Sequence, residues 1–246
     1  CETALLGELE AARARCPTLR ELMTFADDGD EKSALATPRR KSPWGTRCAT
    51  KPAGFAAVDT AADDIALIAF TSGTTGVPKG AMHSHRDIMS VCVCFPRSIL
   101  DVGSDATDEI FCGPAPLAFT FGLGGLLLFP LALGASALLL PQAAPASLLE
   151  AVARHRATTL FATPTFYRQM LPLLAGHDLS SLRRCVAAGE PLPAATWQQW
   201  HAATGIRLID GIGSTELLHI FISARAGEMR PGATGKPVPG YAAAVL

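Results

Sequence analysis

IALIAFTSGTTGVPKG, residues 65–80, joins an apolar run to a loop that is rich in glycine, serine and threonine and contains one lysine. An apolar run bounded by turn residues is typical of a strand buried on both faces, so residues 65–70 predict a buried strand. Gly73, Gly76 and Gly80 allow the following backbone to approach a ligand closely, and consecutive N–H groups in such a loop bind anions. The stretch therefore predicts a strand that leads into a phosphate-binding loop.

The side chains of the loop support this prediction, because hydroxyl groups and the Lys79 ammonium both suit the β- and γ-phosphates of ATP. The loop is not a Walker A motif, since Pro78 precedes Lys79 and Gly80 follows it. A glycine-rich turn without a ligand is the alternative, and a lysine at this spacing after a buried strand argues against it. The expected phosphate-binding residues are Thr71, Ser72, Gly73, Thr74, Thr75, Gly76 and Lys79.

Around this loop the chain alternates strand and helix patterns. Apolar segments predict strands at residues 135–140, 158–161, 185–188 and 207–209, and helical patterns occupy residues 145–155, 164–174 and 193–203. Ser84 and Asp87 have the spacing of a capping box, so a further helix is expected to begin there. This alternation predicts an α/β fold of layered, largely parallel sheets flanked by helices.

Before the loop the pattern is weaker. Residues 2–15 predict an amphipathic helix and residues 19–25 a strand. Residues 27–57 pass from acidic to basic and proline-bearing sequence, which predicts a surface loop or linker.

Composition narrows the function class. The chain is 49% hydrophobic and 17% charged with a formal net charge of -1, so it is expected to be globular and not to bind nucleic acid. Its seven cysteines include no CxxC pair, so neither a disulfide framework nor a zinc site is expected, and thiols in a reducing cytoplasm are the simpler interpretation. Residues 119–140 are long enough to cross a bilayer, but glycines and prolines interrupt them, which favours a buried helix followed by a strand and no membrane partner.

A second glycine-rich motif, GIGSTE (residues 211–216), follows the segment RLID; alone it is indistinguishable from a capped turn. TSGTTGVPKG (residues 71–80) resembles the phosphate signature of the adenylate-forming superfamily of acyl- and aryl-CoA ligases, luciferases and peptide-synthetase adenylation domains, and GIGSTE resembles its second nucleotide motif. The resemblance implies that Thr215 contacts the α-phosphate and that Glu216 helps to hold Mg²⁺, which accepts a carboxylate together with phosphate oxygens. With Lys79, these residues form the expected catalytic set.

The same resemblance assigns the adenine site. AAGEPLP (residues 187–193) and the Asp-Gly before the second motif match the family's adenine-lining turns. The implied adenine-binding residues are Gly189, Glu190, Pro191, Asp210 and Gly211. For Glu190 the alternative is a charge at the N-terminus of the helix at residues 193–203.

PLAFTFGLGG (residues 116–125) lies where the family places its acyl-pocket motif, with Phe119 at the position of a histidine. The resemblance implies an acid pocket lined by Phe119, Thr120, Phe121, Gly122, Ala187, Ala188, Ile212, Gly213 and His219. As alternatives, Phe119 and Phe121 are simple core residues and His219 is a satisfied buried histidine. The motif has no aspartate to pair with an amino-acid ammonium group, and residues 211–223 and 230–241 are most similar to benzoate-CoA and 2-aminobenzoate-CoA ligases.

The resemblance therefore implies ATP-dependent activation of an aromatic carboxylic acid, of the benzoate or 2-aminobenzoate type, to an acyl-adenylate and then transfer to coenzyme A. The expected partners are the acid, ATP and CoA, and a homodimer stays open. A medium-chain acyl-CoA ligase and a non-catalytic nucleotide-binding paralogue are the alternatives. Residues 1–246 are expected to be part of the family's large domain, without the small C-terminal domain that supplies a catalytic lysine, so the chain alone is expected to be inactive.

Overall fold

The computed structural model describes residues 6–13, 15–18, 49–71, 76–103, 106–140 and 143–244. The chain divides into two compact units, Cys1–Asp59 and Thr60–Leu246. In the first unit, α1 (Leu6–Arg13) confirms the expected helix and buries no residue. Residues 49–57 are exposed and largely irregular, as predicted for a surface loop, whereas the strand predicted at residues 19–25 falls outside the described residues.

The second unit is built on a seven-stranded sheet with the strand order β4-β3-β5-β6-β7-β8-β9. The five strands from β4 to β7 run parallel, and β8 and β9 are antiparallel to their neighbours, so the largely parallel α/β fold is confirmed. The strands are β3 (Ile110–Cys112), β4 (Ser136–Leu138), β5 (Thr159–Ala162), β6 (Arg184–Ala188), β7 (Leu208–Gly213), β8 (Ile220–Ser223) and β9 (Lys236–Pro237).

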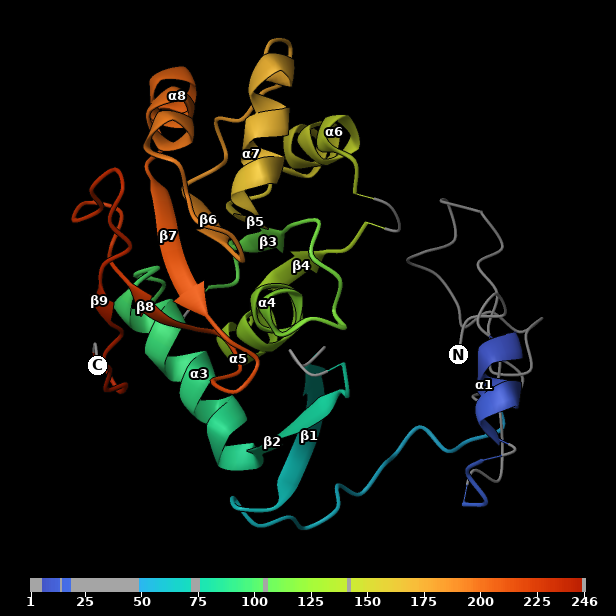
Figure 1. Ribbon diagram of the computed structural model, residues 1–246. Coiled ribbons are helices and arrows are strands. Elements are labelled where there is room, and N and C mark those ends of the chain that lie inside the picture. The colour runs from blue at the N-terminus through green and yellow to red at the C-terminus, as the bar shows by residue number, and fades with distance from the viewer. Residues whose placement is uncertain are drawn as a thin grey trace. The chain divides into compact units, whose positions relative to one another are not determined.

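Helices cover this sheet from both sides. Figure 1 shows α6, α7 and α8 on one side and α3, α4 and α5 on the other. The first group comprises α6 (Pro145–His155), α7 (Pro164–Met170), η4 (Leu171–Leu173) and α8 (Ala194–Thr204), and the second comprises α3 (His85–Ser98), α4 (Thr120–Leu123), η3 (Gly124–Leu128) and α5 (Phe129–Leu133). The predicted capping box begins α3: the Ser84 N–H donates to Asp87 Oδ2 at 2.7 Å, and the Asp87 N–H donates to the Ser84 hydroxyl.

Residues 119–140 form broken helices followed by a strand, as expected. α4, the π-helical turn η3 and α5 succeed one another, and Gly134, with φ of 70°, ends α5 before β4. A π-helical turn is uncommon and often marks a functional site. Within the described part of the chain, no helix is both long and apolar enough to span a membrane.

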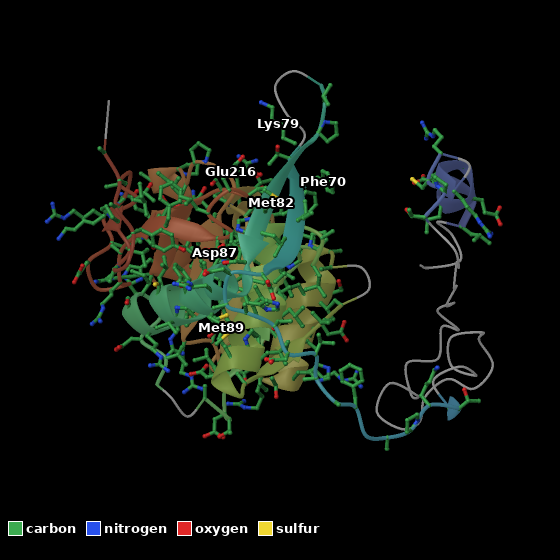
Figure 2. The ribbon with its side chains drawn as sticks, turned by 90° about the horizontal axis from the view of Figure 1, so that it is seen from below. Phe70, Lys79, Met82, Asp87, Met89 and Glu216 are labelled. Atoms are coloured by element: carbon green, nitrogen blue, oxygen red, sulfur yellow. The ribbon has the colours of Figure 1, made fainter. Side chains whose placement is uncertain are left out.

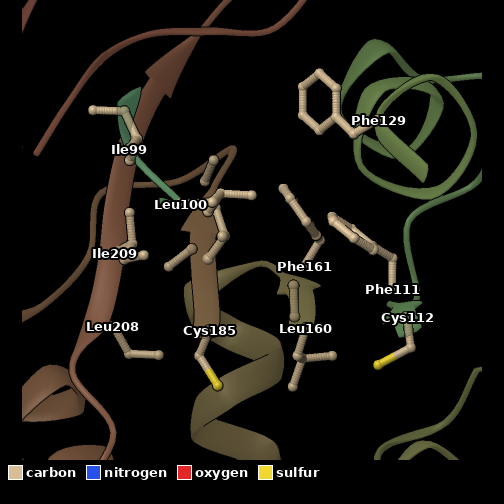
Figure 3. Packing of buried hydrophobic residues seen from close by; sticks show 14 of the residues in the cluster. Ile99, Leu100, Phe111, Cys112, Phe129, Leu160, Phe161, Cys185, Leu208 and Ile209 are labelled. Atoms are coloured by element: carbon tan, nitrogen blue, oxygen red, sulfur yellow. The ribbon is translucent and has the colours of Figure 1, made fainter. Parts of the chain in front are cut away.

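Aromatic side chains dominate the core between the sheet and α5. Phe111 and Phe161 stack with ring centroids 6.1 Å apart, and Phe129 lies 6.2 Å from Phe161. Figure 3 shows these rings on one face of the sheet, and the side chains of Leu160 and Cys185 on the opposite face. Each large ring removes considerable apolar surface from water, so this cluster fixes the strands whose carboxyl ends carry the candidate site.

A buried ion pair anchors the other end of the sheet. The Arg184 Nη1 atom lies 2.8 Å from Glu109 Oε1, and the Thr158 hydroxyl donates to the other oxygen of the same carboxylate. The Arg184 Nε–H donates to the Leu100 carbonyl at 2.6 Å. Because both charges are paired and hydrogen-bonded, their burial is tolerated.

The strand predicted at residues 65–70 exists, but the prediction that it is buried on both faces is wrong. Among the described residues, β1 (Ile65–Thr71) pairs with β2 (Lys79–Ser84) alone, in a separate antiparallel sheet of two strands. Ile68 and Phe70 are 50% and 72% exposed, and Met82 on β2 is 66% exposed; Figure 2 shows Phe70 and Met82 on this hairpin. Alternate residues of a strand face opposite sides, and no second layer of the described residues buries these side chains.

Candidate functional site

The candidate residues from distant parts of the sequence meet at the carboxyl ends of neighbouring strands. Ala187 and Ala188 end β6 and lie opposite Asp210 and Gly211 of β7 in the parallel register. β7 then meets the antiparallel β8, so the direction of the sheet reverses at this point. In open α/β sheets, ligands bind in the crevice outside the carboxyl ends of the parallel strands.

The phosphate loop is the tip of the β1–β2 hairpin. Thr71 ends β1 opposite Lys79, the first residue of β2, and the Thr71 hydroxyl donates to the Lys79 carbonyl at 3.4 Å. Gly76 has φ of 77°, a left-handed conformation that favours glycine. Lys79 is exposed, and Ser72, Gly73, Thr74 and Thr75 lie outside the described residues.

A buried histidine that the sequence analysis did not identify joins this hairpin to the second motif. His83 is 3% exposed, and its Nε2–H donates to the Thr215 carbonyl at 2.8 Å. The Leu218 N–H donates to the same carbonyl at 3.2 Å, within the turn that carries Thr215. The sequence offered one signal for this histidine. His83 follows Met82 directly on β2, and neighbouring residues of a strand face opposite sides, so His83 faces inward where Met82 faces water.

Glu216 borders a small cavity beneath this contact. The cavity has a volume of about 200 Å³, and His83, Asp87, Glu216 and Tyr241 are among its lining residues. No group of three or more histidines, cysteines, aspartates and glutamates that would hold a metal ion occurs among the described residues. One exposed carboxylate fits Mg²⁺ that shares its coordination with phosphate oxygens and water, because this ion rarely uses an all-protein cage.

The turn after Glu216 contains a strained residue. Leu218 has φ of 66° although it is only 1% exposed, and a left-handed conformation is unfavourable for a residue with a branched side chain. Such outliers persist where packing determines them and are frequent at functional sites. The turn delivers His219 into the core.

Two residues of the proposed adenine set have clear structural partners. Glu190 Oε2 accepts hydrogen bonds from the Thr165 N–H at 3.2 Å and the Thr165 hydroxyl at 2.6 Å. The Glu190 carboxylate therefore lies at the N-terminus of α7, and its alternative role as a charge ahead of α8 stays a prediction. Asp210 Oδ2 accepts from the Thr234 hydroxyl at 2.8 Å; burial raises the pKa of Asp210, and the hydrogen bonds from Thr234 and the Gly211 backbone oppose that shift.

The other adenine candidates are compatible with a ligand-binding turn. Gly189 has φ of 90°, which a side chain would disfavour, and Pro191 is exposed. A Cβ atom on Gly211 would lie 2.6 Å from Ile220 Cδ1. The glycine therefore lets β7 and β8 approach closely.

His219 lies at the centre of an aromatic cluster. Its ring centroid is 4.7 Å from that of Phe129, 5.3 Å from Phe95, 5.7 Å from Phe121 and 6.1 Å from Phe161. Neither ring nitrogen makes a hydrogen bond of good geometry among the described residues, but the Phe121 backbone interacts with the ring as a weak hydrogen-bond partner, so the alternative of a satisfied buried histidine stays a prediction. Burial lowers the pKa of His219 to about 3, and the Phe121 backbone opposes this shift only in part, so the ring is neutral at pH 7.

The remaining acid-pocket candidates divide between core and surface. Phe121 is partly buried and packs on the core, as its alternative stated, and Ala187 and Ala188 are buried. Phe119 is 66% exposed, so its alternative as a core residue is wrong: it precedes α4 and turns away from the packed face. Ile212 and Gly213 are also exposed. Thr120 begins α4. Gly122 is buried, and a Cβ atom at this position would lie 2.3 Å from the Pro116 carbonyl oxygen.

With this geometry in place, comparison with known proteins identifies the family. A family model described as AMP-binding enzyme matches residues 2–246. The chain belongs to the AMP-binding enzyme family.

Relatives of this AMP-binding chain include ligases for aromatic acids. It is 38% identical to a benzoate–CoA ligase of Thauera aromatica over 230 residues, which cover 92% of this chain and 41% of the relative. It is 40% identical to an anthranilate–CoA ligase of Pseudomonas aeruginosa over 176 residues, 71% of this chain and 33% of the relative. An anthranilate CoA ligase solved in complex with anthranoyl-AMP superposes with a TM-score of 0.85 at 37% identity, over 97% of this chain and 45% of that structure. The AMP-binding chain thus spans less than half the length of these relatives.

Proposed function

We propose that this AMP-binding chain supplies the nucleotide and acid sites of an AMP-forming aryl-CoA ligase. The observation that carries the proposal is the hydrogen bond of 2.8 Å between His83 and Thr215, because it brings the base of the phosphate loop beside the second nucleotide motif. Both motifs of an adenylating site therefore face one region of the protein, at the carboxyl edge of a parallel sheet.

The proposed reaction has two steps. A carboxylate oxygen of the acid attacks the α-phosphorus of ATP, the bond to the β-phosphate oxygen breaks, and pyrophosphate leaves. The thiol of CoA then attacks the acyl carbonyl, loses its proton, and displaces AMP. The first step needs positioned reactants and neutralised charge and does not need a proton to be removed.

The residues of this chain fit the first step. The Lys79 ammonium and the loop backbone neutralise the β- and γ-phosphates, and Thr215 donates to the α-phosphate. Glu216 holds Mg²⁺, which when bound neutralises phosphate oxygens during the displacement. The adenine ring is placed between the Gly189–Pro191 turn and the Asp210–Gly211 pair.

The acid site lies against the aromatic cluster, and its chemistry favours a small aromatic acid. Phe121 and Ala188 present apolar surface, and the neutral His219 has ring nitrogens that make no hydrogen bond of good geometry within the described residues. A polar ring substituent, such as an amino or hydroxyl group, is the chemistry that these nitrogens recognise. The benzoate and anthranilate ligases among the relatives support the same substrate class.

We further propose that residues 1–246 form part of the large domain of a longer cytoplasmic enzyme, and that a second domain supplies a catalytic lysine and most of the CoA site. The 246-residue chain alone is then expected to show negligible adenylation. Robust acyl-AMP formation by this chain would show that its own residues suffice for the first step.

The test is carboxylate-dependent exchange of pyrophosphate into ATP by the full-length protein, with 2-aminobenzoate, benzoate, hexanoate and phenylalanine as acids. We expect exchange with the aromatic acids, and loss of exchange in the variants Lys79→Ala and Glu216→Ala. Lys51→Ala serves as the charge-matched control, because Lys51 is exposed in the first unit. Exchange with hexanoate alone would contradict the aromatic assignment, and a folded protein that binds ATP without any exchange would contradict the ligase assignment.

A further inference from the structure

We infer that His83 is a positioning residue that fixes the phosphate-loop hairpin against the Thr215–Glu216 turn, and so sets the geometry of the adenylation step. This inference rests on the proposed function. His83 itself touches no reacting atom in the proposed reaction, and it acts through the backbone of Thr215.

The contact is well suited to this role because it is short and its donor side chain is buried. The distance of 2.8 Å between Nε2 and the Thr215 oxygen is that of a good N–H···O bond, and His83 is 3% exposed. The His83 N–H is a buried donor, and a buried donor that loses its partner carries the full cost of its desolvation, whereas the Thr215 carbonyl would keep its hydrogen bond from the Leu218 N–H. The bond therefore restrains the turn more firmly than an exposed contact would.

The hairpin needs such a restraint. β1 and β2 form a sheet of two strands that is separate from the seven-stranded sheet, and a hairpin of two strands is at best marginally stable by itself. Among the described side-chain hydrogen bonds, the bond from His83 joins residues 132 positions apart and links the hairpin to the second motif.

The placement of His83 on β2 makes the coupling direct. Lys79 begins β2 and His83 is its fifth residue, so the same strand carries both the loop lysine and the imidazole. On the other side, the Thr215 carbonyl belongs to the peptide that leads into Glu216. A shift of either partner by about 1 Å is enough to lower a rate by about 100-fold where the reaction depends on alignment.

A structural role alone makes a different prediction from a positioning role. If His83 only filled space, a side chain of similar bulk would preserve the adenylation rate, and any loss would follow the loss of thermal stability. If its N–H positions Thr215, a residue that keeps a donor at a similar reach should preserve the rate, and one without a donor should not.

The experiment uses the full-length protein with the variants His83→Gln, which keeps an N–H donor, and His83→Leu, which keeps bulk but has no donor. His155→Leu is the matched control, because His155 is exposed in the last turn of α6. We measure pyrophosphate exchange with benzoate, the KM for benzoate and for ATP, the affinity for ATP alone, and the thermal midpoint.

For His83→Leu we expect kcat for exchange to fall by about 10- to 100-fold with the KM for benzoate within about two-fold, and for His83→Gln we expect kcat within about three-fold of the unmodified protein. ATP affinity should fall in His83→Leu and not in His83→Gln. Equal exchange in His83→Leu and His155→Leu would overturn the inference. The inference would also be overturned if His83→Gln and His83→Leu lost exchange activity equally and in proportion to the decrease of their thermal midpoints.

If His83→Leu does not fold, His83→Asn replaces it, because its amide is one methylene shorter than that of glutamine. His83→Asn should then exchange more slowly than His83→Gln at a similar thermal midpoint, and equal rates would overturn the inference. Failure of the proposed function has a different signature, since the unmodified protein would then show no exchange with any acid.

Discussion

Replacing Gly124 with alanine should destabilise the protein through a single side chain, the ring of His219. A Cβ atom at position 124 would lie 2.4 Å from His219 Cδ2 and 3.0 Å from Nε2. Ordinary carbon contacts are about 3.5–4.0 Å, so the overlap is about 1 Å. The ring cannot move away freely, because Phe95, Phe129 and Phe161 surround it.

The expected cost follows from this overlap. Overpacking a core usually costs about 1–3 kcal/mol, and the lower backbone entropy of alanine in the unfolded chain returns less than about 1 kcal/mol. For a chain of this size a loss of 1 kcal/mol lowers the thermal midpoint by about 2–4 °C. We therefore expect Gly124→Ala to lose about 1–2 kcal/mol of the free energy of unfolding.

Urea unfolding of Gly124→Ala, His219→Ala and the double variant measures this effect. Because His219→Ala vacates the space that the new methyl group needs, the two losses should couple favourably by about 1 kcal/mol or more. Gly227→Ala is the control, since nothing lies within 4 Å of a Cβ atom there. Additive losses, within about 0.5 kcal/mol, would refute the reasoning.

Three further predictions concern buried ionisable groups. The pKa of His219 is lowered to about 3 from 6.5, so between these pH values the unfolded chain binds a proton that the folded chain excludes. The free energy of unfolding should therefore fall as the pH decreases from 6.5 towards 3. His219→Gln should lessen this fall between pH 7 and pH 5, and an unchanged slope would contradict the prediction. Burial raises the pKa of Cys185 to about 12, so a thiol reagent at pH 8 should modify the exposed Cys16 in the native protein and Cys185 only after unfolding, as peptide mapping would show. Arg184→Met removes the nearer of the two guanidinium groups beside Glu109, which keeps Arg183 at 3.5 Å, and should cost about 1.5–3 kcal/mol in urea unfolding, as expected for a hydrogen bond to a charged group. A loss below about 0.5 kcal/mol would contradict this.

The sequence predicted the elements that have local signals. The helix at residues 145–155 coincides with α6, because proline at its start and an apolar stripe define it within one segment. The capping box of Ser84 and Asp87 marked the beginning of α3 for the same reason. The strands β5, β6 and β7 were recognised from short apolar runs, with boundaries shifted by a few residues.

Burial and pairing were harder to predict, because they depend on segments that are distant in sequence. Residues 65–70 contain no local signal for whether other elements pack on one face of the strand or on both. The apolar run was therefore interpreted as a strand buried on both faces. β2 begins at the last two residues of the first nucleotide motif, and β8 begins four residues after the second; neither was predicted as a strand. β8 in particular reverses the sheet, which no local signal indicated.

The candidate site shows the same division. Lys79, Thr215 and Glu216 could be named as candidates because their motifs are contiguous in sequence. His83 and Thr234 were missed, since the importance of each depends on a partner far along the chain, the Thr215 carbonyl and the Asp210 carboxylate respectively. Long-range partners of this kind follow from the topology of the sheet and not from the spacing of residues.

The outer face of the β1–β2 hairpin has a practical consequence for purification and oligomer measurements. Ile68, Phe70 and Met82 present an apolar surface to water, and such a surface beside free strand edges promotes self-association. If the 246-residue chain forms dimers or larger species in solution, association through this exposed face is a sufficient explanation, and a natural assembly need not be involved. Oligomeric state is therefore best determined on the longest available form of the protein, and Phe70→Lys offers a soluble variant for work on the shorter chain.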